Sequence, residues 1–200
     1  MFIITGFKLN LKKIILFASG SGSNAEKICK YFEKKKNVSL ELLVCNNPNA
    51  KVLKKTNKYF INSMIIDYES FYNSSAVLEK ILNINPSLIV LAGFLWKIPE
   101  KLIKAFPEKI INIHPALLPK FGGKGMYGIN IHNAVIEKKE TKSGITIHYV
   151  NKNYDEGEVI FQKTIDIKKN ETPEELSSRI LKLEHNFFPR IINQVLESGK

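Results

Sequence analysis

Two side chains that could take part in catalysis lie at the end of an apolar stretch, in the segment Asn112-Ile113-His114. Residues two apart in a strand face the same side, so Asn112 and His114 project together while Ile113 faces away. A carboxamide and an imidazole placed side by side can both donate hydrogen bonds to one oxygen atom, as stabilisation of an oxyanion requires. The alternative is a polar pair that only caps the loop of prolines and glycines after it, and the residues alone leave both interpretations open.

A carboxylate near this pair would favour the catalytic interpretation, because it could orient and charge the histidine. The loop of residues 153–157 offers Asp155. Its alternative role is that of an ordinary turn residue, since Asp and Gly are common in turns. We interpret two further histidines, His132 in a helical pattern and His148 in a strand pattern, as structural.

The second candidate site is a glycine loop, SGSGSNA at residues 19–25. It formally matches the dinucleotide pattern G-x-G-x-x-A, but the next strand ends in Cys-Asn-Asn at residues 45–47, without the acid that would hold a ribose. It is not a Walker A loop either, because the Gly-Lys-Ser/Thr ending is absent. Free N–H groups at the start of a helix bind anions, so we expect a phosphate monoester at Gly22, Ser23 and Asn24. The alternative is a tight strand-to-helix turn capped by Ser or Asn.

The other polar candidates carry weaker signals. Glu184 lies beside the apolar stripe of a helical pattern, where an acid can simply mark the solvent edge. Cys29 and Cys45 are the only cysteines, and they lack metal-ligand spacing. We therefore expect no metal site and a reduced, cytoplasmic protein.

The elements that must position these residues alternate along the chain. Apolar runs rich in Ile, Leu and Val, separated by helical patterns, predict a parallel sheet covered by helices on both faces. Two later runs follow each other with only a loop between them, which suits an antiparallel pair and makes the sheet mixed. The expected strands are residues 13–19, 40–46, 63–67, 87–93, 109–114, 144–150 and 158–166.

The chain ends in a predicted long helix. Thr172, Pro173 and Glu175 fit an N-cap, a first-turn proline and the acid of a capping box.

Composition excludes several classes of protein. The 200 residues, 44% of them hydrophobic, suit one domain with a sizeable core, and no apolar run approaches the roughly 18 residues of a membrane span. The net charge of +11 comes mostly from lysines scattered along helices, and the chain contains a single Trp. We interpret this charge as a solvated face that also attracts small anions, and we expect no nucleic acid and no membrane as partners.

From about residue 12 to 196 these segments, in order, resemble the phosphoribosylglycinamide formyltransferase family, folate-dependent enzymes of purine synthesis. The related methionyl-tRNA formyltransferases continue with an Arg-Gly element and a second domain, so the smaller enzyme fits better. The segments that carry the resemblance are FASGSGSN (17–24), LAGF (91–94), NIHPALLPKF (112–121), YDEGEVI (154–160) and LEHNFFP (183–189).

The resemblance implies a single-domain, Rossmann-like formyltransferase fold over residues 1–200, with 1–11 as an N-terminal extension. It implies transfer of a formyl group from 10-formyltetrahydrofolate, a co-substrate, to the amine of glycinamide ribonucleotide. A protonated histidine and an amide would stabilise the oxyanion, and an aspartate would help to move the proton. The implied catalytic residues are Asn112, His114 and Asp155; the implied ribonucleotide-binding residues are Gly22, Ser23, Asn24 and Glu184; the implied folate-binding residues are Leu95, Trp96, Lys97 and Ile98.

Some positions depart from the family pattern. The family often has an arginine early in the helix after the third strand, and none lies near Glu69. Trp96 and Lys97 are unusual in the folate segment, so pterin contacts there would rest on the backbone. The Pro-rich turn and the resemblance together predict a cis Leu118–Pro119 bond.

Two other functions stay open at this point: a formyltransferase that acts on a different amine, such as a nucleotide sugar, and a non-catalytic protein that binds nucleotide phosphates. The sequence supports no prediction of the oligomeric state.

Overall fold

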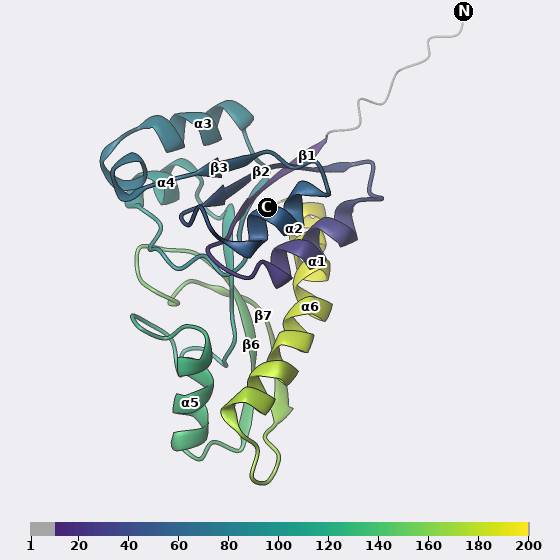
Figure 1. Ribbon diagram of the computed structural model, residues 1–200, viewed down its shortest axis with the longest axis vertical. Coiled ribbons are helices and arrows are strands. Elements are labelled where there is room, and N and C mark those ends of the chain that lie inside the picture. The colour runs from purple at the N-terminus through teal and green to yellow at the C-terminus, as the bar shows by residue number, and fades with distance from the viewer. Residues whose placement is uncertain (1–10, 200) are drawn as a thin grey trace, which may run out of the picture.

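The computed structural model describes residues 11–199 (Figure 1). Within them, strands form one mixed sheet in the order β3-β2-β1-β4-β5-β6-β7. β1 to β5 pair in parallel, whereas β6 is antiparallel to β5 and β7 is antiparallel to β6. The strands are β1 (Lys12–Phe17), β2 (Val38–Cys45), β3 (Ser63–Ile65), β4 (Leu88–Leu91), β5 (Ile110–His114), β6 (Lys142–Tyr149) and β7 (Val159–Asp166).

Helices connect most of these strands. The last helix begins with the predicted capping box, in which Thr172 accepts a hydrogen bond from the backbone N–H of Glu175 and the Glu175 side chain accepts one from the backbone of Thr172. The helices are α1 (Ser23–Phe32), α2 (Lys51–Asn57), the short π-helix η1 (Glu69–Asn73), α3 (Ala76–Ile84), α4 (Glu100–Ala105), α5 (Ile129–Glu137) and α6 (Pro173–Ser198).

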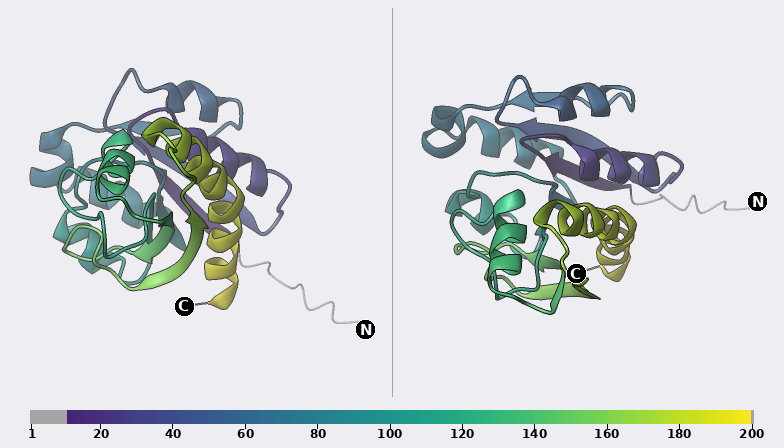
Figure 2. Two further views of the ribbon diagram at one scale, coloured as in Figure 1. Left: turned by 90° about the horizontal axis from the view of Figure 1, so that it is seen from below. Right: turned by 60° about the horizontal axis from the view of Figure 1, so that its bottom comes forward.

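Alternation along the buried strands divides the core between the two faces of the sheet. Ile14 and Leu16 of β1 pack with α1, α2, α5 and α6, whereas Ile15 and Phe17 pack with η1, α3 and α4. Figure 2 shows α6 lying alongside α1 on the first of these faces. The single α/β domain therefore has helices on both faces of its sheet, as predicted.

The order of the strands places a crevice next to β1. The chain moves from β1 to β2 on one side and from β4 to β5 on the other, so the loops after β1 and β4 diverge. Open α/β sheets bind ligands at such a point, beyond the carboxyl ends of the strands. The glycine loop, the folate-like segment and the loop after His114 all follow strands that end at this edge.

The remaining predictions about local structure have mixed outcomes. The Leu118–Pro119 peptide bond is cis, as predicted. β3 and β4 are shorter than expected, at Ser63–Ile65 and Leu88–Leu91. The predicted N-terminal extension lies, apart from Leu11, outside the described residues. No helix of residues 11–199 is long and apolar enough to cross a membrane.

Candidate functional site

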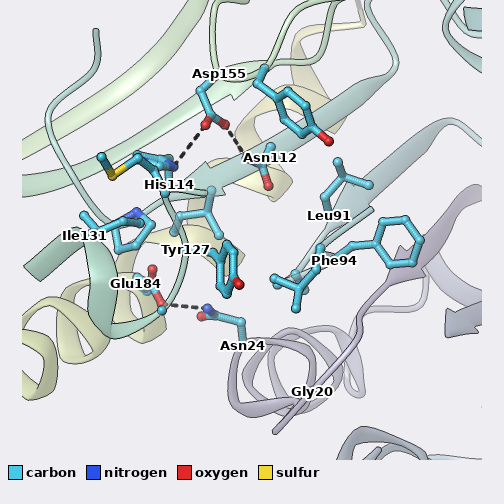
Figure 3. Close-up of a pocket in the computed structure, with 18 of the residues that line it drawn as sticks. Gly20, Asn24, Leu91, Phe94, Asn112, His114, Tyr127, Ile131, Asp155 and Glu184 are labelled. Carbon is cyan, nitrogen blue, oxygen red and sulfur yellow. Dashed lines mark hydrogen bonds and ion pairs between the residues drawn. The ribbon is translucent and has the colours of Figure 1, made fainter. Parts of the chain in front are cut away.

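One cavity of about 830 Å³ opens at the carboxyl ends of β1, β4 and β5 (Figure 3). Segments far apart in the chain line it, among them the loop between β6 and β7 and the middle of α6. Every residue that the sequence singled out for a site lies in its wall: Gly22, Ser23, Asn24, Leu95, Trp96, Lys97, Ile98, Asn112, His114, Asp155 and Glu184.

Asp155 meets both polar residues at the end of β5. Its Oδ1 lies 3.5 Å from Asn112 Nδ2, and its Oδ2 lies 3.6 Å from His114 Nδ1. Figure 3 shows the carboxylate pointing at the amide and the imidazole together. The three side chains expected to form one group therefore lie together, and Asp155 makes contacts beyond those that a turn residue requires.

The ring of His114 is fixed by its other nitrogen. A carbonyl oxygen only accepts hydrogen bonds, so Nε2–H donates to Phe121 O at 2.8 Å, and Nδ1 is left facing Asp155. Burial lowers the pKa of His114, and the opposing effects of Asp155 and of the Phe121 carbonyl do not reverse the shift. The expected protonated His114 is therefore not the resting form at neutral pH.

The carboxylate of Asp155, by contrast, is held in its charged form. Burial alone would raise the pKa of Asp155, but the imidazole side chains of His148 and His114 and the backbone N–H of Gly123 lower the pKa overall. Gly123 N–H donates to Oδ2 at 3.0 Å, which also ties the loop after β5 to this carboxylate.

His148 belongs to this cluster, although its sequence context suggested a structural residue. Its Nδ1–H donates to Tyr149 O at 2.9 Å, and its Nε2 lies 3.2 Å from Asn112 Nδ2 and 3.6 Å from Asp155 Oδ1. The register explains this contact, because β6 pairs antiparallel with β5 and His148 stands directly opposite Asn112. The contact between His148 and Asn112 could have been predicted from the sequence only by assigning the antiparallel register of β5 and β6 residue by residue.

The constrained turn after β5 is built on the same pairing. Thr146, opposite His114, accepts a hydrogen bond from Leu118 N at 3.0 Å and donates one to Ala116 O at 2.7 Å. Gln162 of β7 donates to Leu118 O at 2.9 Å. Side chains from β6 and β7 thus satisfy the backbone of the turn, and the turn fixes the position of His114.

The start of α1 is open to the cavity. Its N-cap is Gly22, with φ at 70°, and no side chain caps the helix. A Cβ atom at Gly22 would lie 2.5 Å from the side chain of Val52, so both the backbone conformation and the close approach of α2 require glycine here. The alternative of a turn capped by Ser or Asn is not what the structure has, and the first N–H groups remain available to an anion.

Asn24 and Glu184 come together from opposite ends of the chain. Asn24 Nδ2 donates to Glu184 Oε2 at 2.7 Å (Figure 3), and Glu184 is only 7% exposed. Burial raises the pKa of Glu184 to about 7, and the hydrogen bond from Asn24 offsets only part of that shift. Glu184 is therefore not a solvent-edge residue, and it forms one group with the glycine loop.

Residues 95–98, which follow β4 after a short connection, form another wall of the cavity. Ser19 Oγ accepts a hydrogen bond from Leu95 N at 3.0 Å, and Tyr72 OH donates to Lys97 O at 2.7 Å, so the backbone of the segment is held from both sides. The Trp96 ring lies 6.0 Å from the ring of Phe71. Lys97 Nζ lies 5.5 Å from the ring centre of Tyr154, the neighbour of Asp155. The segment offers backbone, aromatic surface and one cation to a ligand.

A formyl transferase family model matches residues 12–192 of the chain. The chain belongs to the formyl transferase family. A phosphoribosylglycinamide formyltransferase of Bacillus subtilis is 39% identical over 191 residues, which cover 93% of this chain and 95% of that protein. A chloroplastic phosphoribosylglycinamide formyltransferase of Arabidopsis thaliana is 37% identical over 194 residues, and the match spans 93% of this chain and 66% of the plant protein.

Solved structures of the family superpose over nearly the whole chain. The phosphoribosylglycinamide formyltransferase of Bacillus halodurans gives a TM-score of 0.84 at 30% identity, over 94% of this chain and 97% of that one. The glycinamide ribonucleotide transformylase 1 of Symbiobacterium toebii gives a TM-score of 0.85 at 27% identity, over 94% and 89% of the two chains. The fold of this formyl transferase is thereby established independently of the motifs.

Lys101 of α4 contacts the segment after Glu69, where the family often has an arginine and this sequence has none. Lys101 Nζ donates to Tyr72 O at 3.0 Å and also contacts Ser74 O, so backbone carbonyls take up its charge. Within residues 11–199, no group of three or more His, Cys, Asp or Glu side chains is placed to hold a metal ion.

Proposed function

We propose that this formyl transferase moves a formyl group from 10-formyltetrahydrofolate to the amine of glycinamide ribonucleotide. The products are formylglycinamide ribonucleotide and tetrahydrofolate, in de novo purine synthesis. One observation carries the proposal: the cluster of Asn112, His114 and Asp155 opens into the same cavity as the uncapped start of α1. A phosphate and a reacting carbonyl can therefore be bound at once.

The ribonucleotide lies between α1 and α6. Its phosphate accepts hydrogen bonds from the N–H groups around Gly22, Ser23 and Asn24, with the positive end of the helix dipole behind them. Glu184 binds the ribose hydroxyls, since a buried carboxyl already bonded to Asn24 has a free oxygen for them.

The formylfolate lies along residues 95–98. Backbone groups of this segment hold the pterin, and the Trp96 ring adds apolar surface to this wall of the cavity. Both substrates then meet at the end of β5, where their orientation replaces a bimolecular collision by a reaction within one complex.

The amine attacks the formyl carbon directly, so the reaction needs no enzyme nucleophile. Charge develops on the formyl oxygen. Asn112, whose amide carries two N–H bonds, keeps one for that oxygen while the other faces His148 and Asp155. A well-placed donor of this kind contributes about 3 kcal/mol to the transition state.

The proton of the amine passes to the pair of His114 and Asp155. The neutral His114 takes it up as the C–N bond forms, and Asp155 stabilises the resulting imidazolium. The proton then goes to the folate nitrogen as its bond to the formyl carbon breaks. The amine thus loses one proton and the folate gains it, with no net change on the enzyme.

We place the reaction in the cytoplasm, in one catalytic domain whose partners are its two small-molecule substrates. Cys29 and Cys45 are both buried as free thiols, which suits a reducing compartment.

An assay of tetrahydrofolate release tests the proposal. Purified protein is mixed with 10-formyltetrahydrofolate and either glycinamide ribonucleotide, an amino nucleotide sugar or no acceptor. Of the three conditions, we expect turnover only when glycinamide ribonucleotide is the acceptor. Turnover with the amino sugar alone would identify the other formyltransferase activity, and tight ribonucleotide binding without turnover would identify a non-catalytic protein.

A further inference from the structure

Tyr127 is the one aromatic residue of the glycine-rich loop after β5 that lies in the wall of the cavity between its two halves. In the view of Figure 3 its ring stands between the group of Asn112, His114 and Asp155 and the pair of Asn24 and Glu184. The residue is 54% exposed, so its surface is open to a ligand in the cavity. Tyr127 is therefore not part of the buried core, and it lines the cavity.

The backbone around Tyr127 is shaped to present this ring. Tyr127 N–H donates to Gly125 O at 3.2 Å, and Tyr127 O accepts from Asn130 N at 3.3 Å, which makes a tight bend just before α5. Gly125 and Gly128 on either side have φ of 88° and 56°. A Cβ atom on either glycine would meet nothing within 4 Å, so glycine is required for conformation and not for space.

The same loop is tied to the catalytic cluster at its beginning. Asp155 accepts from Gly123 N, and Phe121 O accepts from His114. The loop therefore leaves the reacting end of the cavity, presents Tyr127 in the middle, and ends in the first turn of α5. A residue so placed faces the part of a bound ribonucleotide that lies between its phosphate and its amine.

We propose that Tyr127 binds the carboxamide that joins the ribose of glycinamide ribonucleotide to its aminomethyl group, and so aims the amine at the formyl carbon. The phenol O–H donates to the carboxamide oxygen, and the face of the ring packs on the ribose carbons. This inference rests on the proposed function. It assigns Tyr127 to the ribonucleotide and not to the folate.

Three variants test this role. Tyr127→Phe removes only the hydroxyl group, and Tyr127→Ala removes the ring. Tyr59→Phe, just after the end of α2 and outside the cavity wall, is the matched control. Ribonucleotide binding is measured by calorimetry without folate. Folate binding is followed by the fluorescence of Trp96, the only tryptophan of the chain.

We expect the Kd and KM for the ribonucleotide to rise about fivefold in Tyr127→Phe, as for the loss of one neutral hydrogen bond, and more in Tyr127→Ala. Folate binding should stay within twofold of wild type, and Tyr59→Phe should match wild type in both. A fourth variant, Gly128→Ala, should reproduce the Tyr127→Ala phenotype, because it displaces the ring without changing its chemistry.

Two results would overturn the inference: ribonucleotide constants within twofold of wild type in both Tyr127 variants, or equal losses for ribonucleotide and folate. If Tyr127→Ala does not fold, the ribonucleotide constants of Tyr127→Phe still test the inference. Absence of formyl transfer by the wild-type protein would instead remove the proposed function, so the two failures are distinguishable.

Discussion

Replacing Asp155 by Asn removes one negative charge from the site while keeping the shape of the side chain. Asp155 has a φ of 54°, a left-handed conformation that Asn also tolerates, so the loop should fold normally. The new amide retains one oxygen acceptor for its neighbours. The change therefore separates the charge of Asp155 from its role in the turn.

The size of the effect follows from the distance to His114. Unit charges 3.6 Å apart, as Asp155 Oδ2 and His114 Nδ1 are, attract each other by about 4–5 kcal/mol at an effective dielectric constant of about 20. Their side chains are 12% and 4% exposed, so solvent screens little of this attraction. The resting imidazole is neutral, and only part of the charge is present in the transition state. We expect a barrier higher by roughly 3–4 kcal/mol, which is a fall of about 10²–10³ in kcat.

Steady-state tetrahydrofolate release measures this change. The control is Asp166→Asn, an exposed carboxylate at the end of β7 away from the cavity. Ribonucleotide binding should stay near wild type in Asp155→Asn, because the start of α1 is unaltered. His114→Asn should be equally damaging, and the double variant should be little worse than either, since the two residues act as a unit. Near-wild-type turnover of a well-folded Asp155→Asn protein would refute the assignment.

The remaining predictions concern the parts that support the cluster. For Glu184, burial raises the pKa to about 7 from an ordinary value near 4.5, so its contribution to folding is greatest at low pH and is lost as pH rises between these values. Urea titrations should therefore show wild type losing about 2–3 kcal/mol relative to Glu184→Gln between pH 5 and pH 8, and parallel pH profiles would contradict the buried carboxyl. Thr146→Val leaves Leu118 N and Ala116 O without partners and should lower the free energy of unfolding by about 2–4 kcal/mol; a change below about 0.5 kcal/mol would mean that the turn does not depend on Thr146. Gly22→Ala should weaken calorimetric binding of the ribonucleotide at least tenfold, because its φ of 70° and the contact with Val52 exclude a Cβ atom, and unchanged affinity would place the phosphate elsewhere.

The elements of the fold were accessible from the sequence because each carried a local pattern. Continuous apolar runs such as residues 87–93 and the capping box at Thr172 specify their conformation with little help from distant residues. The ends of most strands differ from the expected ranges by one or two residues, and β3 and β4 are clearly shorter, since strand ends depend on which neighbouring strand supplies hydrogen bonds.

The site could be predicted in its parts but not in its contacts. Asn112 and His114 follow from strand periodicity, whereas the bond between Asn24 and Glu184 joins residues 160 positions apart and depends on the packing of α6 against α1. The contact of His148 with Asn112 depends on the register between β5 and β6. The position of Tyr127 depends on the conformation of a loop whose sequence has no periodic pattern. The neutral state of His114 depended on burial, which the sequence does not quantify.

The central claim is transfer of the formyl group from the folate to glycinamide ribonucleotide, and carbon-13 in the formyl group of 10-formyltetrahydrofolate tests it most directly. Nuclear magnetic resonance would follow the labelled carbon during reaction with glycinamide ribonucleotide. We predict that the label appears in the formamide carbon of formylglycinamide ribonucleotide, with one tetrahydrofolate formed per labelled product. Label that stays on the folate, or that is released as formate while the ribonucleotide remains unformylated, would contradict the account.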